Sequence, residues 1–386
     1  MEDNNKDINN WLAVTRSRNE KWWYSAFHNM IEMHEAESGK RFDRYHELGQ
    51  YAFGEKLGLW IVVPQTLIVH VGTDIIYMIT GGNSLKKAHQ ILCKNCKPIK
   101  TTYFIMIFAS LQFFLSHLPS FNSIIGVSIS AAVIYSTIVW TSSAHKGALP
   151  DVKYDGRSST TIGNVFDFFT GLGTIAFGYA AHNVLLEIQA TVPSTPEKPS
   201  KKAMWKGMIA AYIVVGLFYF PVAIFGYWAF GNSVTDNILM SLDKPHWLTA
   251  VANIFVVIHV TGSYQVFAVP VFDMMESLMV RRMNFKPTWY LRFISRNIYV
   301  ALTMLVATIF PFFGGLLSFL GGLVFAPTTY FLPCIIWLVV YKPKRFSGSW
   351  CANWFCIVFG VLLMVLGSIG AMREIILQAK DYKFFS

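Results

Sequence analysis

Nine apolar segments follow one another along this chain of 386 residues. Each is close to the roughly 20 residues that a helix needs to cross the hydrocarbon core of a bilayer. Backbone polar groups find no partner in lipid, so such segments must be helical to span it. The sequence therefore predicts an all-α, multi-span integral membrane protein, with spans at about 57–80, 101–118, 121–142, 164–188, 207–230, 247–271, 293–312, 315–341 and 352–376.

The spans define a transmembrane domain over residues 57–376, between an N-terminal segment (1–56) and a short C-terminal tail (377–386). The N-terminal segment contains no span but carries aromatic residues such as Trp22 and Trp23. A cytosolic helix lying on the membrane surface and a partly disordered tail are both open for this segment.

Turn-forming residues mark two further boundaries. The apolar run from 293 to 341 is too long for one span, and Pro311, Gly314 and Gly315 divide it. Residues 118–120 (Leu-Pro-Ser) predict a tight hairpin between the second and third spans.

Charge predicts the orientation in the membrane. Charged residues make up only 14% of the chain, and the net charge is +10. Lys and Arg lie in short loops between the spans, which is the membrane pattern, so no nucleic-acid partner is expected. With the N-terminus in the cytosol, 19 Lys and Arg fall on the cytosolic side and 12 on the other. Nine spans then place the C-terminus outside the cell.

Cys93 and Cys96 form a C-x-x-C pair in a hydrophilic loop. A structural zinc site takes four ligands, and only His89 is close, so no metal is predicted. A local disulfide and two free thiols are the alternatives. The chain also lacks phosphate-binding and metalloprotease motifs, so neither an enzyme nor a bound cofactor is predicted.

The span at 163–189 is interrupted by Gly171, Gly173 and Gly178, which weaken a helix by about 1 kcal/mol each relative to alanine. One interpretation is an unwound segment whose backbone groups, with His182 and Asn183, bind a zwitterion in the middle of the membrane. The other is close helix packing, because small residues line membrane helix interfaces.

Polar residues in two other spans are further candidates. His70 and Asp74 are four residues apart and share a helix face, where they could carry a proton or form a structural hydrogen-bond pair. Ser263 and Gln265 could line a polar pocket or bond a neighbouring helix. His259 shares a face with Ser263.

Several stretches resemble the lysine/histidine transporter-like branch of the plant amino acid/auxin permease family. The most specific are ATVPSTPEKPSK at 190–201 and FAPTTYFLPC at 325–334, and the resemblance covers nearly the whole chain. It implies secondary transport of amino acids such as lysine, histidine or neutral ones. Transport would be driven by the proton gradient, without another cofactor, across the plasma membrane. The implied partners are the amino acid, protons and the lipid bilayer, with the oligomeric state left open.

The resemblance also implies a leucine-transporter-type fold of two inverted five-helix repeats, with the site between them at the membrane midplane. In that scheme residues 163–189 form the first helix of the second repeat. The residues expected to bind substrate are Gly173, Phe177, Gly178, Tyr179, His182, Asn183, Ser263 and Gln265, and those expected to couple protons are Asp74 and His70.

One departure from the family pattern affects function. The stretch KWWYSAFHN at 21–29, which the family continues into two spans, here runs directly into residues 30–50. The first repeat is therefore expected to be incomplete, with a junction at about Asn29–Met33. The missing first helix would supply the other half of the substrate site. The alternative function is a truncated, transport-inactive or regulatory relative.

Overall fold

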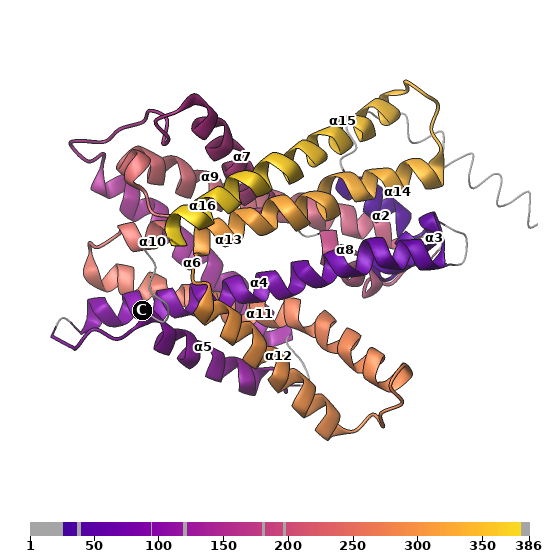
Figure 1. Cartoon of the computed structure of the whole chain (residues 1–386), viewed down its shortest axis with the longest axis horizontal. Helices are drawn as coiled ribbons and strands as arrows, with labels where there is room; N and C mark the ends of the chain where they lie inside the picture. The colour runs from indigo at the N-terminus through magenta and orange to yellow at the C-terminus, as the bar shows by residue number, and fades with distance from the viewer. Residues whose placement is uncertain are drawn as a thin grey trace, which may run out of the picture. The chain divides into compact units, whose positions relative to one another are not determined.

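The computed structural model describes residues 26–36, 40–93, 95–118, 122–179, 182–195 and 198–379 (Figure 1). Its secondary-structure elements are helices, and seven helical stretches in these ranges are long and apolar enough to cross a membrane. The predicted all-α, multi-span class is therefore confirmed. The seven stretches are α4 (Glu55–Leu92), most of α6 (Asn122–Lys146), α9 (Ser200–Phe230) with a following turn, α11 (His246–Arg281), α12 (Trp289–Ile309), α13 to α14 (Phe313–Tyr341) and α15 to α16 (Gly348–Ala379).

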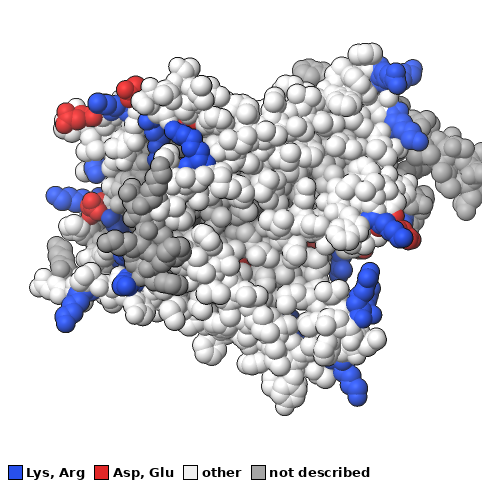
Figure 2. All heavy atoms as spheres, in the orientation of Figure 1, with Lys and Arg blue, Asp and Glu red and all other residues white. Residues whose placement is uncertain are grey.

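Two predicted spans correspond to shorter helices. The span at 101–118 is α5 (Thr101–Leu115), and the span at 164–188 is two helices, α7 (Thr161–Gly178) and α8 (His182–Ala190). On the face drawn in Figure 2, most blue and red atoms lie toward the left and right edges of the view, and the stretch between them is mostly white. This distribution suits helices whose middle stretches face lipid.

Helix α4 continues twelve residues beyond the predicted end of the first span at residue 80. It has 38 residues, about 57 Å at 1.5 Å per residue, which exceeds the hydrocarbon core of a bilayer. Gly81 and Gly82 lie inside this helix, and a side chain at either position would collide with Phe108 or Ile105 of α5. These glycines allow α4 and α5 to approach closely.

The division of the long apolar run at 293–341 is confirmed, because α12 ends at Ile309 and α13 begins at Phe313. The predicted hairpin at 118–120 joins α5 to α6, but residues 119–121 lie outside the described ranges. Trp22 and Trp23, for which the sequence leaves a surface helix and a partly disordered tail open, also lie outside them.

The chain divides into two compact units, each considered by itself. Unit 1 comprises residues 1–69, 165–213 and 318–372, and unit 2 comprises residues 70–164, 214–317 and 373–386. The core of unit 2 is built from α4, α5, α11 and α12 and includes fully buried Met78, Phe108, Tyr264 and Val300.

Part of the N-terminal segment belongs to the core of unit 1. Helices α2 (Ala26–Met33) and α3 (Tyr45–Phe53) precede α4 and bury Met30, Met33 and Leu48 against Leu186 and Ile336. Asn29 of α2 also donates a hydrogen bond of 2.7 Å to Asn353 of α15 (Gly348–Leu362). The proposed junction at residues 29–33 therefore lies within a packed helix.

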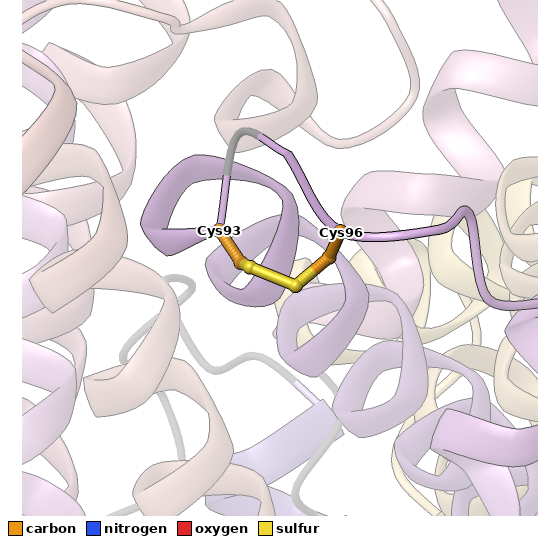
Figure 3. The surroundings of a disulfide bond; sticks show 2 residues. All are labelled: Cys93 and Cys96. Atoms are coloured by element: carbon orange, nitrogen blue, oxygen red, sulfur yellow. A yellow bond between two sulfur atoms is a disulfide. The ribbon is translucent and has the colours of Figure 1, made fainter.

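Cys93 and Cys96 are joined by a disulfide bond in the turn after α4 (Figure 3). This is one of the two alternatives left open by the sequence. Among the described residues no group of His, Cys, Asp and Glu could hold a metal ion.

Loops that the sequence places outside the cell meet at one end of unit 2. Lys87, at the end of α4, pairs with Asp243 at 2.7 Å, and its hydrogen bond holds the pKa of the Asp243 carboxyl below its usual value. Asn232 donates to the Asp155 side chain at 2.8 Å. Arg157 lies 3.8 Å from Glu374 near the C-terminus. The loops after α4, α6 and α9 and the C-terminal helix therefore share one end of this unit.

Candidate functional site

The predicted break in the span at 163–189 lies after Gly178. Helix α7 ends at this glycine, Tyr179 is in a turn, and α8 begins at His182. Gly171 and Gly173 are inside α7 rather than in an unwound stretch. His182 and Asn183 are the first residues of α8, but their side chains lie outside the described part of the structure.

Gly173 has a packing role. Its carbonyl group lies where a side chain on Gly321 would have to stand, and a side chain on Gly173 itself would lie 2.8 Å from the Ser318 carbonyl oxygen. The Thr174 hydroxyl also bonds the Ser318 hydroxyl at 2.8 Å. Such a close approach is what the helix-packing interpretation of this glycine describes. A role of Gly173 in substrate binding stays a prediction.

The helix packed against α7 is itself irregular. Residues Gly321–Phe325 (η2) and Pro327–Phe331 (η3) form wide turns of the π-helix type between α13 (Phe313–Leu320) and α14 (Leu332–Tyr341). Such turns occur frequently at functional sites. Phe177, near the end of α7, meets the Phe325 ring edge-on at 5.0 Å. Irregular backbone therefore lies on two helices that pack together close to the predicted substrate residues.

The Tyr179 ring stacks on Tyr212 of α9, with ring centroids 5.8 Å apart. This contact places the turn after α7 against a third helix of unit 1. An aromatic pair at the end of a helix provides an apolar surface and two hydroxyl groups. Such a surface suits a ligand with both polar and apolar parts.

Asp74 is fully buried in α4 and accepts a hydrogen bond of 2.6 Å from the Tyr299 hydroxyl of α12. Its other carboxylate oxygen, Oδ1, has no hydrogen-bond partner among the described residues. A buried carboxylate with a free oxygen has a position where a proton can bind. This geometry suits the predicted proton-carrying role, which stays a prediction.

His70 lies one helical turn before Asp74 and is also fully buried. Its ring packs against Phe267 of α11, with ring centroids 5.6 Å apart. Tyr77 contacts the same ring at 6.0 Å. His70 therefore shares the buried face of α4 with Asp74, without a direct hydrogen bond to it among the described contacts.

Gln265 of α11 bonds a neighbouring helix. Its side-chain amide donates to Gln112 of α5 at 2.8 Å and to the Ser116 hydroxyl at 3.3 Å. Ser263 is half-buried beside Tyr77. Both predicted residues belong to unit 2, so their relation to the α7–α8 break in unit 1 stays a prediction.

A polar stripe on α12 was missed by the sequence analysis. Four polar residues at spacings of four, three and four share one face of this helix and bond three other helices. They and their partners are Arg292 with Glu276, Arg296 with the carbonyl oxygen of Ser116, Tyr299 with Asp74, and Thr303 with Tyr264. The spacing of these polar residues in an otherwise apolar span could have revealed the buried face.

Known proteins match the chain closely. A family described as "Transmembrane amino acid transporter protein" matches residues 23–373. Lysine histidine transporter-like 1 of Arabidopsis thaliana is 58% identical over 99% of this chain and 94% of its own length. Lysine histidine transporter-like 3 and 4 of the same plant are each 51% identical, over 99% and 97% of this chain and 95% and 93% of their own lengths.

The matches also bear on the expected missing helices. The alignment with the first of these relatives runs over 425 positions. Since this chain has 386 residues, at least 39 of those positions have no residue of this chain opposite them. Taken together, these positions equal the length of about two spans of 20 residues.

One family assignment follows from these findings. It rests on the match over most of the chain, together with the helical spans and the interrupted helix. Both the family and these relatives are transporters rather than enzymes. The chain belongs to the transmembrane amino acid transporter family and is a multi-pass membrane protein of amino acid transport.

Proposed function

We propose that this protein is a proton-coupled symporter that moves amino acids across the plasma membrane. The observation that carries the proton coupling is Asp74, a buried carboxylate in the middle of a spanning helix. One of its oxygens is bonded to Tyr299, and the other has no hydrogen-bond partner in the part of the chain that the structure describes. Ionisable groups inside the membrane are costly and serve function by default. Lysine, histidine and neutral amino acids are the first substrates to test, since the relatives' names mention lysine and histidine.

The amino acid binds, in this proposal, where α7 ends and α8 begins. The end of α7 leaves carbonyl groups without helical partners, and the start of α8 leaves amide groups free. These groups complement the ammonium and the carboxylate of an amino acid. Phe177 and Tyr179 provide the adjoining apolar surface, and Gly173 and Gly178 allow the backbone to approach. His182 and Asn183 begin α8 and belong to the same proposed site, and Ser263 and Gln265 of unit 2 stay predicted binding residues.

The test is uptake of radiolabelled amino acids by the 386-residue protein in a yeast strain that lacks its own amino acid permeases. Uptake should rise as the external pH falls and should collapse when a protonophore removes the gradient. Asp74→Asn keeps the size of the side chain but cannot release a proton, so uptake should lose its dependence on pH and on the gradient.

The matched control is Asp243→Asn, which removes a carboxylate that is exposed at one end of unit 2. It should keep the pH dependence of the unchanged protein. If uptake by Asp74→Asn, measured at normal surface abundance, also kept the pH dependence of the unchanged protein, the coupling role of Asp74 would be refuted.

A transport-inactive or regulatory relative is the second candidate. The observation in its favour is the shortfall of at least 39 aligned positions, together with the direct passage from Asn29 into residues 30–50. Sequencing the transcript would reveal whether a segment encoding two apolar spans lies at this junction. Robust uptake by the 386-residue form would rule this candidate out.

A further inference from the structure

The short helix α8 depends on contacts from elsewhere in the chain. It has nine residues and no basic residue in its last turn. Helices shorter than about 12 residues are marginal on their own, and a C-terminal end leaves four carbonyl groups unpaired with a partial negative charge. Two of the predicted substrate residues, His182 and Asn183, are the first residues of α8, so the stability of this helix bears on the proposed site.

Arg41 provides the missing positive charge from a distant part of the chain. Its Nη2 atom donates to the carbonyl oxygens of Gln189, Ala190 and Val192, at 3.0, 3.3 and 3.2 Å. The first two residues end α8, and Val192 follows in the loop. One guanidinium group therefore caps the C-terminal end of α8. A cation is favourable there because this end of a helix carries a partial negative charge.

The same N-terminal segment also bonds the start of α9. Glu35 accepts a hydrogen bond of 2.6 Å from the hydroxyl of Ser200, which is the first residue of α9. Although burial favours the neutral form, hydrogen bonds from Ser200 and Ser194 hold the pKa of Glu35 below its usual value. Lys201 pairs with Glu32 at 2.8 Å. The charged form of Glu35 is thus the stable one at neutral pH.

Gln189 connects the two ends directly. This residue is fully buried, and its side-chain amide donates to the Ile31 carbonyl oxygen and to the Ser200 hydroxyl, both at 3.2 Å. The carbonyl oxygen of the same residue is held by Arg41. The end of α8, the start of α9, residues 31–35 and Arg41 therefore form one bonded group within unit 1.

We propose that Arg41 is a positioning residue for transport, which holds α8 in place so that its first turn keeps the geometry needed to bind an amino acid. The proposal rests on the proposed function for its transport role. Arg41 does not touch the substrate and acts through the helix. Residues 31–41, next to the expected junction, would thus support the half of the site that this chain retains.

The first experiment measures the concentration dependence of amino acid uptake. Arg41→Gln should raise KM by about threefold to tenfold at matched surface abundance, because hydrogen bonds from a charged group are among the stronger ones. Arg41→Lys should raise KM less, since an ammonium group keeps the positive charge but lacks the planar set of N–H donors of a guanidinium group. Lys206→Gln, at an exposed position on α9, removes the same charge and should leave KM unchanged.

The second experiment does not depend on transport. Hydrogen–deuterium exchange of the purified protein should be at least about tenfold faster for the amides of α8 in Arg41→Gln, while the amides of α11 keep their rate. Unchanged exchange in α8 would overturn the proposed cap. Faster exchange with an unchanged KM would overturn the positioning role. If the unaltered protein transports nothing, the proposed function fails, and exchange in α8 still decides whether Arg41 holds the helix.

Discussion

Tyr299 determines the surroundings of Asp74, although the two residues are 225 positions apart in the chain. The sequence identifies Asp74 because a carboxylate in an apolar span is conspicuous. Tyrosine is common in membrane helices, so Tyr299 is not conspicuous, and its partner follows from the packing of α12 on α4. A single sequence could therefore predict the charged member of the pair but not the hydroxyl that bonds it.

Removing that hydroxyl should change the proton dependence of uptake. In Tyr299→Phe the carboxylate loses a donor that favours its ionised form, so protons bind more readily. The external pH at which uptake is half-maximal should rise by about one unit, the equivalent of one hydrogen bond to a charged group. Tyr290→Phe, at an exposed position on α12, should leave the pH profile in place. If the unchanged protein, Tyr299→Phe and Tyr290→Phe all had the same pH profile of uptake, a role of Tyr299 in proton binding would be ruled out.

At the scale of helices, the glycines of the sequence have two different uses that composition does not distinguish. Gly178 stands where α7 ends, whereas Gly173 and Gly321 allow α7 to contact the turn η2. The sequence leaves an unwound segment and close packing both open for these glycines, because glycine weakens a helix and also lets helices approach. The structure has α7 end at Gly178, while Gly173 packs against a neighbour about 150 positions later in the chain.

Substitution by alanine should distinguish a glycine at a close helix contact from a glycine with free space around it. Gly321→Ala forces the new carbon against the Gly173 carbonyl group and should cost about 1–3 kcal/mol, as overpacking does. Gly207→Ala in α9 meets no atom within 4 Å and gains helix propensity. Thermal unfolding of the detergent-purified proteins should therefore occur at a lower temperature for the first variant only. Equal midpoints would argue against close packing of α7 on η2.

At the scale of the whole molecule, the sequence predicts which loops share a side of the membrane, and contacts within each unit agree with the grouping. Lys87 with Asp243 and Arg157 with Glu374 join loops assigned to the outside. Arg41 with Val192 joins loops assigned to the cytosol. This grouping follows from the order of the spans, and the count of Lys and Arg then predicts which group faces the cytosol. The shortened N-terminal segment, by contrast, required the structure, since its packing depends on buried residues of distant helices.

The cysteines allow the orientation itself to be tested. Disulfides persist in oxidising surroundings, so the bond between Cys93 and Cys96 fits a loop outside the cell. A membrane-impermeant maleimide should label these cysteines in intact cells only after an impermeant phosphine has reduced them. Labelling should disappear in the Cys93→Ser/Cys96→Ser variant. Cys351 is exposed in the first turn of α15, next to a loop assigned to the cytosol, so it should react only after permeabilisation. Labelling of Cys351 in intact cells, with Cys93 and Cys96 protected, would reverse the proposed orientation.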